Sequence, residues 1–218
     1  QSFLLARAGL LPSQRGTETR PDQYIDKIES IRQVRGWEAL SPAVKWERYK
    51  VRPLNHPVRR LMALSHWLRQ GLFERWESFL LPPVLSNPAL DSRRGLQNSL
   101  KVEDPAFWSG FYDFGRPLAS PDAALLGLGR INEILINVIL PFLLGWAEVH
   151  GLPHLSQKIV SLFYEFPGLE ANSILRHMTA QLRLSQRQIN SACRQQGLVH
   201  IYKSFCTEGL CHNCPLGR

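Results

Sequence analysis

The chain has 218 residues, of which 44% are hydrophobic and 10% aromatic, so it can bury a sizeable core in one or two domains. This composition excludes wholesale disorder. Lys and Arg outnumber Asp and Glu by 26 to 18, and the resulting net charge of +8 favours an anionic partner such as nucleic acid or an acidic lipid surface. Many enzymes are equally basic, so the net charge alone does not distinguish a nucleic-acid-binding or lipid-binding protein from an enzyme.

The first eleven residues have the apolar spacing of a helix and lack the order of a secretory leader. Arg7 interrupts the only early apolar stretch, so no charged region, apolar region and cleavage site follow one another. The chain begins with Gln1 in the middle of this pattern. We therefore expect a cytoplasmic protein, present here as a fragment of a longer chain.

Helical periodicity dominates the first 80 residues. Asp22 caps a helix with an isoleucine stripe, and Ser41 followed by proline predicts a short helix over 42–49. Pro57 opens another helix, which Gly71 ends. From Pro82 onward, prolines and a glycine predict a loop or linker. The predicted organisation is a helical region with a basic segment over 1–81, a linker over 82–103 and a helical core over 104–218.

The second half predicts a short aromatic helix after Asp104 and then the longest helical region, from Pro121 to His150, kinked or split at Pro141. Its apolar run, 134–147, is shorter than the roughly 20 residues that a bilayer needs, so we expect a buried core helix and no membrane partner. Further helices are expected over 154–165 and 170–182, and a last one after Ser185, interrupted at Gly197. The predicted fold class is all-α, an irregular multi-helix bundle with a C-terminal cysteine knuckle.

All four cysteines lie in the final 26 residues, with the spacing C-x12-C-x4-C-x2-C: Cys193, Cys206, Cys211 and Cys214. Two thiolates separated by two residues can bind one ion across a tight turn, and a third thiolate four residues earlier can join them. The same spacing occurs in plant-type iron–sulfur ligation, so the predicted cofactor is zinc or an iron–sulfur cluster. A disulfide between two of the last three cysteines is the alternative.

The spacing does not decide which residue would be the fourth ligand. In one unbroken helix Cys193 and Cys206 would lie about 20 Å apart, too far to share an ion. Either Gly197 breaks the helix or Cys193 is a packed core thiol. His212 and His200 are the substitutes.

The stretch 45–60 is rich in cations, with aromatic residues among them. Arginine forks suit phosphates, aromatic faces suit bases, and the helix opened by Pro57 offers free backbone donors. The sequence thus predicts a nucleic-acid or phosphate surface, with DNA or RNA as the partner, and the alternative is a solvated helix face with one arginine buried against a carboxylate. The cations are Lys45, Arg48, Lys50, Arg52, Arg59 and Arg60.

Polar residues also recur within the long apolar helix, where Arg130, Glu133 and Asn137 share one face. The plain interpretation is a hydrogen-bonded core network that fixes helix packing. The functional interpretation is a polar cleft in which Glu133 or Glu170 acts as the catalytic acid, the catalytic base or a metal ligand. The residues of the proposed network are Arg130, Asn132, Glu133, Asn137, Glu170 and Asn172.

Several short motifs occur together in order: A-G-L-L-P from Ala8, R-P-L-N-H-P-V-R-R from Arg52, I-N-E-I-L-I-N-V-I-L-P from Ile131, L-E-A-N-S-I from Leu169, and S-Q followed by C-x4-C-x2-C. In these motifs the chain resembles the bacterial domain-of-unknown-function family 2851. The resemblance implies the C-terminal half of a protein about twice as long, whose own N-terminal half is a partner, and it supplies no activity. The residues that match by position are Arg52, Asn55, Pro57, Arg59, Asn132, Asn137, Glu170, Asn172, Cys206, Cys211 and Cys214. Cys193 lies outside the family's pattern, and the segment from Ser185 to Cys206 is longer here than in some relatives.

The leading hypothesis is a nucleic-acid-associated module with a structural metal site. The alternatives are an enzyme whose catalytic residues lie mainly in the absent N-terminal region, and a purely structural or interaction domain.

Overall fold

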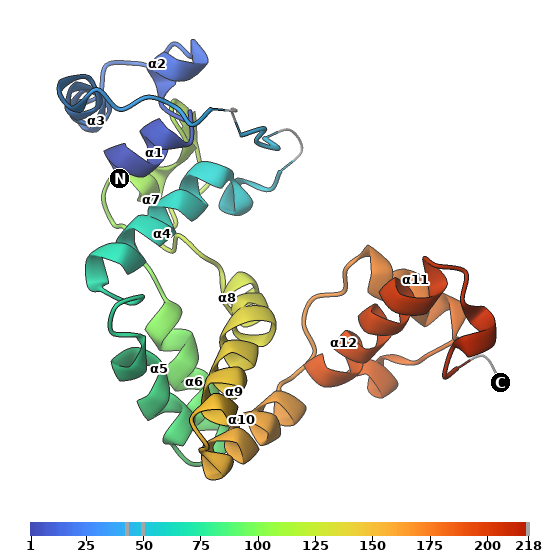
Figure 1. Cartoon of the computed structure of the whole chain (residues 1–218). Helices are drawn as coiled ribbons and strands as arrows, with labels where there is room; N and C mark the ends of the chain where they lie inside the picture. The colour runs from blue at the N-terminus through green and yellow to red at the C-terminus, as the bar shows by residue number, and fades with distance from the viewer. Residues whose placement is uncertain (42–43, 49–50, 217–218) are drawn as a thin grey trace. The chain divides into compact units, whose positions relative to one another are not determined.

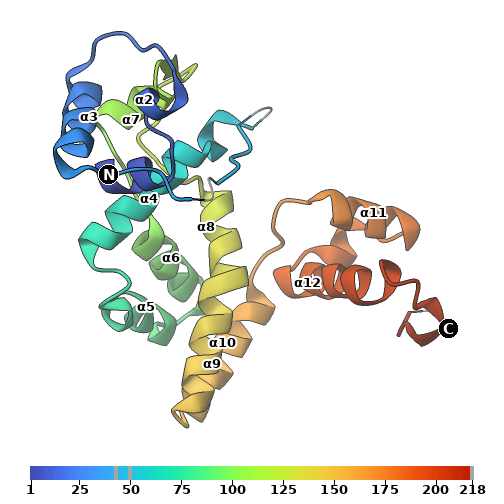
Figure 2. The same cartoon turned by 45° about the horizontal axis from the view of Figure 1, so that its top comes forward.

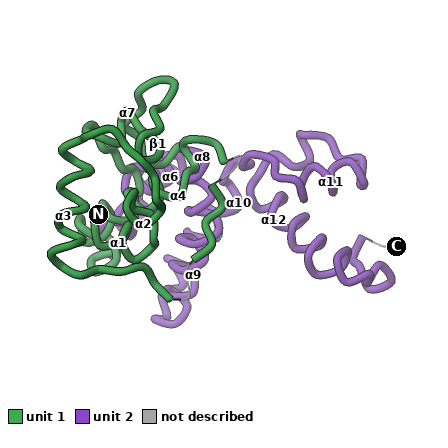
Figure 3. Tube along the Cα trace, turned by 90° about the horizontal axis from the view of Figure 1, so that it is seen from above, with its two compact units in different colours: residues 1–76, 100–127 green, residues 77–99, 128–218 purple. Residues whose placement is uncertain are grey.

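The computed structural model describes residues 1–41, 44–48 and 51–216. Most of them are helical, and the strands among them form one small antiparallel pair, so the predicted all-α class is confirmed. The chain divides into two compact units, Gln1–Trp76 with Leu100–Gly127 and Glu77–Ser99 with Leu128–Arg218 (Figure 3). Each unit is therefore built from two separate stretches of chain.

Unit 1 joins three N-terminal helices to α4 and to an aromatic hairpin (Figure 1). The Asp22 carboxylate accepts hydrogen bonds from the N–H groups of Tyr24 and Ile25, and Gly71 ends α4 in the left-handed conformation, both as predicted. The helix predicted over 42–49 is wrong where the structure describes it, because 44–48 has no regular secondary structure. The elements are α1 (Ser2–Arg7), α2 (Pro12–Arg15), α3 (Gln23–Arg35), the 3-10 turn η1 (Pro53–Asn55), α4 (Pro57–Gln70), α7 (Phe107–Gly110), β1 (Phe111–Asp113) and β2 (Arg116–Pro117).

The core of unit 1 forms around Trp108, which is fully buried. The ring of Phe107 stacks on Phe111, with centroids 4.7 Å apart, and Phe114 meets Trp108 edge to face at 5.2 Å. Such aromatic pairs contribute roughly 0.5–1.5 kcal/mol each beyond the area they bury. The aromatic helix predicted after Asp104 is thus present, and the Asp104 carboxylate accepts a hydrogen bond from the N–H of Ala106 at its start.

Unit 2 contains a helical bundle and a C-terminal helical segment. Leu135, Leu140 and Leu143 of the long helix are buried, as are Ile159 and Leu162 of α10. The elements are α5 (Trp76–Leu85), α6 (Ala89–Leu100), α8 (Leu128–Ile134), the π-helix η2 (Leu135–Ile139), α9 (Leu140–Val149), α10 (Pro153–Glu165), α11 (Ser173–Gln181), the 3-10 turn η3 (Gln186–Ile189), α12 (Ala192–Ile201), the π-helix η4 (Tyr202–Cys206) and the 3-10 turn η5 (Cys211–Asn213).

The linker predicted over 82–103 is wrong, because α5 and α6 occupy most of it. Pro83 has no N–H to bond the carbonyl of Phe79 four residues earlier. That carbonyl instead accepts a hydrogen bond of 2.7 Å from the Ser99 hydroxyl of α6. A tertiary contact therefore stabilises a helix end that the prolines alone would break.

The long apolar helix begins at Leu128, later than predicted, and runs without a break to Val149 (Figure 2). The expected split at Pro141 does not occur. Five residues of π-helix, Leu135–Ile139, lie just before the proline, and the N–H of Leu140 bonds the carbonyl oxygen of Leu135 five residues earlier.

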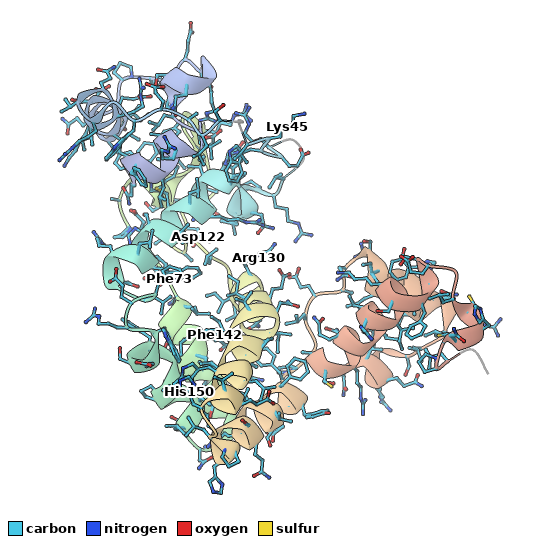
Figure 4. The ribbon with its side chains drawn as sticks, viewed as in Figure 1. Lys45, Phe73, Asp122, Arg130, Phe142 and His150 are labelled. Atoms are coloured by element: carbon cyan, nitrogen blue, oxygen red, sulfur yellow. The ribbon has the colours of Figure 1, made fainter. Side chains whose placement is uncertain are left out.

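This helix is also only partly buried, which corrects the expectation of a core helix. Over its 22 residues it is long and apolar enough, by length and composition alone, to cross a membrane, and it is 28% buried in its most apolar window. One face packs inward, whereas Val138 and Phe142 are exposed (Figure 4).

The C-terminal segment has its own small core, formed by Leu175, Met178, Ile189 and Leu198. Ser185 and Gln188 form the predicted capping box, although it opens η3, and Ser191 caps α12. Gly197 does not interrupt α12, which continues directly into η4.

Candidate functional site

The predicted basic segment lies on unit 1, before and within the first turn of α4. Lys45, Arg48, Arg52 and Arg60 are exposed, and Lys45 is labelled in Figure 4. Lys50 falls outside the described residues. The structure thus leaves four of the six predicted cations on the surface.

Arg59 is the exception, because its side chain is fully buried. One guanidinium nitrogen donates to the carbonyl oxygens of Trp108 and Phe111, and the other donates to those of Asp122 and Ala124. Burial lowers the pKa of Arg59, and the carboxylates of Asp122 and Asp104 oppose that shift. Arg59 therefore holds the hairpin region to α4, and the prediction that it belongs to the phosphate surface is wrong.

The two described aromatic residues of the segment, Trp46 and His56, are held within the fold, and Tyr49 falls outside the described residues. The indole N–H of Trp46 donates to the carbonyl oxygen of Ala8 at 2.8 Å, and His56 is buried. The first helical residues, Pro57 and Val58, are buried as well, so the backbone donors expected there do not face solvent. The exposed charged groups of the described segment are mainly cationic, with Glu47 among them.

Beneath the surface lies a buried cluster of charged and titratable groups. Arg15 forms a bidentate ion pair with Asp113, with N–O distances of 2.8 and 2.9 Å, and Nε2 of His56 lies 3.7 Å from the same carboxylate. Burial lowers the pKa of His56; Asp113 acts against this, and Arg15, Arg116 and Arg48 add to it. Sequence reasoning missed Arg15 and Asp113, which are 98 residues apart and give no local signal.

The polar residues of the long helix do not form one buried network. Arg130 pairs with Glu133 at a site where both side chains are about one-third exposed. Asn132 accepts a hydrogen bond from Gln97 of α6, and Asn137, which is exposed, accepts one from Gln196 of α12. These are separate interhelical contacts, and the prediction of a single core network is wrong.

The two other members of the predicted network have local roles. Asn172 caps α11 by accepting a hydrogen bond from the N–H of Leu175. Glu170 is exposed, and its carboxylate approaches the start of α8, where a Cβ added to Gly129 would lie 3.7 Å from it. Glu133 pairs with Arg130 and Glu170 is exposed, and within the described part of the chain neither carboxylate belongs to a group of three or more His, Cys, Asp or Glu side chains that could hold a metal.

The three terminal cysteines lie around a chain reversal. Cys206 ends η4, Gly209 has a left-handed φ of 66°, and the N–H of Cys214 donates to the carbonyl oxygen of Cys211. Within the described residues the four thiols are free, and no group of three or more His, Cys, Asp or Glu side chains is arranged to hold a metal. His212 is exposed, and His200 bonds the Ser204 hydroxyl.

Cys193 cannot join the other cysteines. It lies 13 residues before Cys206 in a helical stretch that continues from α12 into η4, and a rise of 1.5 Å per residue separates their backbones by about 20 Å. Of the two alternatives for Cys193, the one in which Gly197 breaks the helix and Cys193 is the fourth ligand is therefore wrong.

A second pair of titratable residues, His66 and Asp104, was also not identified from the sequence. Nε2 of His66 lies 3.3 Å from the carboxylate of Asp104, and both side chains are about nine-tenths buried. His66 lies on the inner face of α4, and Asp104 was recognised only as a helix start. Their proximity is set by packing between distant segments.

The chain is thus an all-α protein with an exposed basic segment over a buried ion-pair cluster. It belongs to the family described as "Protein of unknown function (DUF2851)", which matches residues 1–173. The resemblance seen in the sequence is confirmed over that range, and the cysteine motif lies beyond it. Neither a curated protein nor a solved structure matches the chain.

Proposed function

We propose that unit 1 binds the phosphate backbone of nucleic acid through its basic surface, defined as Lys45, Arg48, Arg52, Arg60 and Arg116. The observation that carries this proposal is that cations from two distant segments lie within electrostatic reach of the same buried histidine. Arg48 precedes α4 and Arg116 lies on β2, yet both act on the pKa of His56.

The packing explains why these cations come together. β2 pairs with β1, with Arg116 opposite Asp113, and Asp113 contacts His56 at the start of α4. The ring of Tyr112 also meets that of His56, with centroids 5.6 Å apart. The buried cluster therefore fixes the distance between two basic segments, as a rigid phosphate-binding surface requires.

The same surface argues for binding that is independent of base sequence. Arg and Lys contacts to phosphates position a protein on nucleic acid, whereas base contacts specify the sequence. Trp46 and His56 are held within the fold, so the described aromatic residues of this segment do not offer faces to bases. The affinity should consequently depend strongly on salt and weakly on sequence.

The test is fluorescence anisotropy of the whole chain with labelled duplex DNA, single-stranded DNA and RNA over a series of salt concentrations. Lys45→Ala with Arg48→Ala should weaken binding roughly tenfold at low salt and reduce the slope of log K against log salt by about 2. The matched control, Arg35→Ala with Lys203→Ala, removes two exposed cations elsewhere and should bind as the wild type does. Absence of salt-dependent binding, or equal losses in the two double variants, overturns the proposal.

We further propose that Cys206, Cys211 and Cys214 together bind one zinc ion or an iron–sulfur cluster. Support comes from the reversal at Gly209 and from the tight turn that carries Cys211 and Cys214, since thiolates on one short turn can converge on an ion. Metal binding would then order the chain end rather than perform chemistry.

Elemental analysis and an absorption spectrum of anaerobically purified protein test this second proposal. Stoichiometric zinc in colourless protein indicates a structural ion, whereas iron with a band near roughly 400 nm indicates a cluster. Cys211→Ser should lose the metal, and Cys193→Ser should retain it. Protein without metal, or with a disulfide among these cysteines, contradicts the proposal.

A further inference from the structure

A pocket of about 560 Å³ lies on unit 1, lined by residues of α1, α3 and α4 and by Trp37. Its volume falls within the range of roughly 300–1,000 Å³ typical of small-molecule sites. It shares no residue with the basic surface.

The polar side of the pocket is cationic. Lys27 of α3 and Arg69 of α4 both line it, and the described lining residues include no carboxylate. Two cations from different helices at one concave site attract an anion, and the low-dielectric walls strengthen that attraction.

A chain of hydrogen bonds positions Arg69. Its guanidinium lies 3.5 Å from Nδ1 of His66, whose Nε2 lies 3.3 Å from Asp104. The carboxylate of Asp104 accepts a further bond from the N–H of Ala106. A guanidinium has five N–H donors, so contact with His66 leaves others for a ligand.

The opposite side of the pocket is apolar and partly open to solvent. Phe3 and Ile31, which line it, are 49% and 38% exposed, and the rings of Phe3 and Trp37 meet edge to face at 5.1 Å. Exposed aromatic and aliphatic groups around a concave site favour a ligand that covers them.

We infer that this pocket binds a small organic anion, with its phosphate or carboxylate group on Lys27 and Arg69 and a flat apolar group against Phe3, Ile31 and Trp37. The proposal requires both parts of the ligand, because the pocket offers one cationic and one apolar wall. Tyr24, which also lines the pocket, stays protonated at neutral pH, since burial raises its pKa, so its hydroxyl adds no negative charge.

Isothermal titration calorimetry of the whole chain tests this with phenyl phosphate and benzoate, alongside inorganic phosphate and phenol. One of the two aryl anions should bind at least about tenfold more tightly than inorganic phosphate and phenol, because only the aryl anions can contact both the cationic and the apolar wall. The stronger of the two identifies the anionic group. Equal affinity for phenol and the aryl anions, or no binding of any of the four, overturns the inference.

Two exposed substitutions locate the ligand without disturbing the fold. Lys27→Gln and Arg69→Gln should each weaken binding of the preferred aryl anion roughly tenfold. Arg35→Gln, on the same helix as Lys27 but outside the pocket, is the matched control and should leave binding unchanged. Unchanged binding in both pocket variants places the ligand elsewhere and contradicts the proposal. Because neither residue belongs to the basic surface, this result does not depend on nucleic-acid binding.

Discussion

Arg59 shows how a charged side chain can be a core residue. Its guanidinium connects the carbonyl oxygens of Trp108 in α7 and of Ala124, in the segment after β2, to the start of α4. A buried donor of this kind stabilises only if its partners are all satisfied, because an unpaired carbonyl in the core costs about 1–3 kcal/mol. The sequence context, with two adjacent arginines after Pro57, does not distinguish the buried residue from the exposed one.

Replacing Arg59 by Lys should lower the free energy of unfolding by roughly 3–5 kcal/mol, because an ammonium keeps the charge but cannot reach both pairs of carbonyls. Urea denaturation followed by circular dichroism measures the loss. Arg60→Lys, at the exposed neighbouring position, is the control and should change stability by less than about 0.5 kcal/mol. Equal effects of the two substitutions would mean that the hydrogen bonds of Arg59 do not stabilise the fold.

The lowered pKa of His56 predicts that the free energy of unfolding depends on pH. Its pKa in the folded protein is lowered from the ordinary value of 6.5, chiefly by burial, so the unfolded chain binds a proton that the folded chain does not. Stability should therefore fall as the pH drops below about 6.5, by up to about 1.4 kcal/mol per pH unit until the folded pKa is reached.

His56→Gln should flatten this part of the pH profile, whatever its effect on stability at neutral pH. His212→Gln removes an exposed histidine and should leave the profile as in the wild type. Denaturation midpoints at several pH values between about 5 and 8 measure both profiles. A His56→Gln profile with the wild-type slope contradicts the assignment.

At the scale of elements, α5 and α6 pack closely against each other. A Cβ added at Gly95 would lie 2.8 Å from Cβ of Pro83, a distance that side chains do not reach without a shift. Pro83 cannot move away easily, because its ring is fixed to the backbone and the preceding turn is tied to Ser99. A glycine within a helix, which by itself weakens that helix, is therefore required here for packing.

Gly95→Ala should destabilise the protein by about 1–3 kcal/mol, because the overlap with Pro83 outweighs the gain of up to about 1 kcal/mol in helix propensity. Gly145→Ala, in α9, is the matched control: a Cβ there meets nothing within 4 Å, so it should stabilise by about 0.5–1 kcal/mol. Opposite shifts in the thermal midpoint are the expected result. A stabilising Gly95→Ala would show that the two helices can separate without cost.

At the scale of the whole molecule, the two units are interleaved in sequence, since α5 and α6 lie between the two stretches of unit 1. Their buried side chains, including Leu80, Val84 and Leu96, belong to unit 2. Gln97 of α6 bonds Asn132 of α8, and Lys158 of α10 bonds the carbonyl oxygen of Leu85, so the pair packs with helices that follow Gly127.

A chain ending at Gly127 should therefore expose the apolar face of α5 and α6. We expect strong binding of the dye ANS and elution as aggregates in size-exclusion chromatography, in contrast to the whole chain. A monodisperse fragment that does not bind the dye would show that α5 and α6 are stable without the later helices.

What could be predicted from the sequence was local. Spacing of apolar residues and the caps at Asp22 and Gly71 predicted the fold class and several helix ends correctly, because these signals act over one or two turns. The same local rules failed at Pro83, where a hydroxyl of α6 bonds the carbonyl that the proline cannot reach, and at Pro141, where the helix continues after a π-helical stretch.

The sequence by itself determined the helical class, the family, the basic character of 45–60 and the clustering of the cysteines. Tertiary structure alone decided that Arg59 is buried and that His66 lies beside Asp104. The physical reason is that the free energy of a charged side chain depends on its burial and partners, and these come from segments that are distant along the chain.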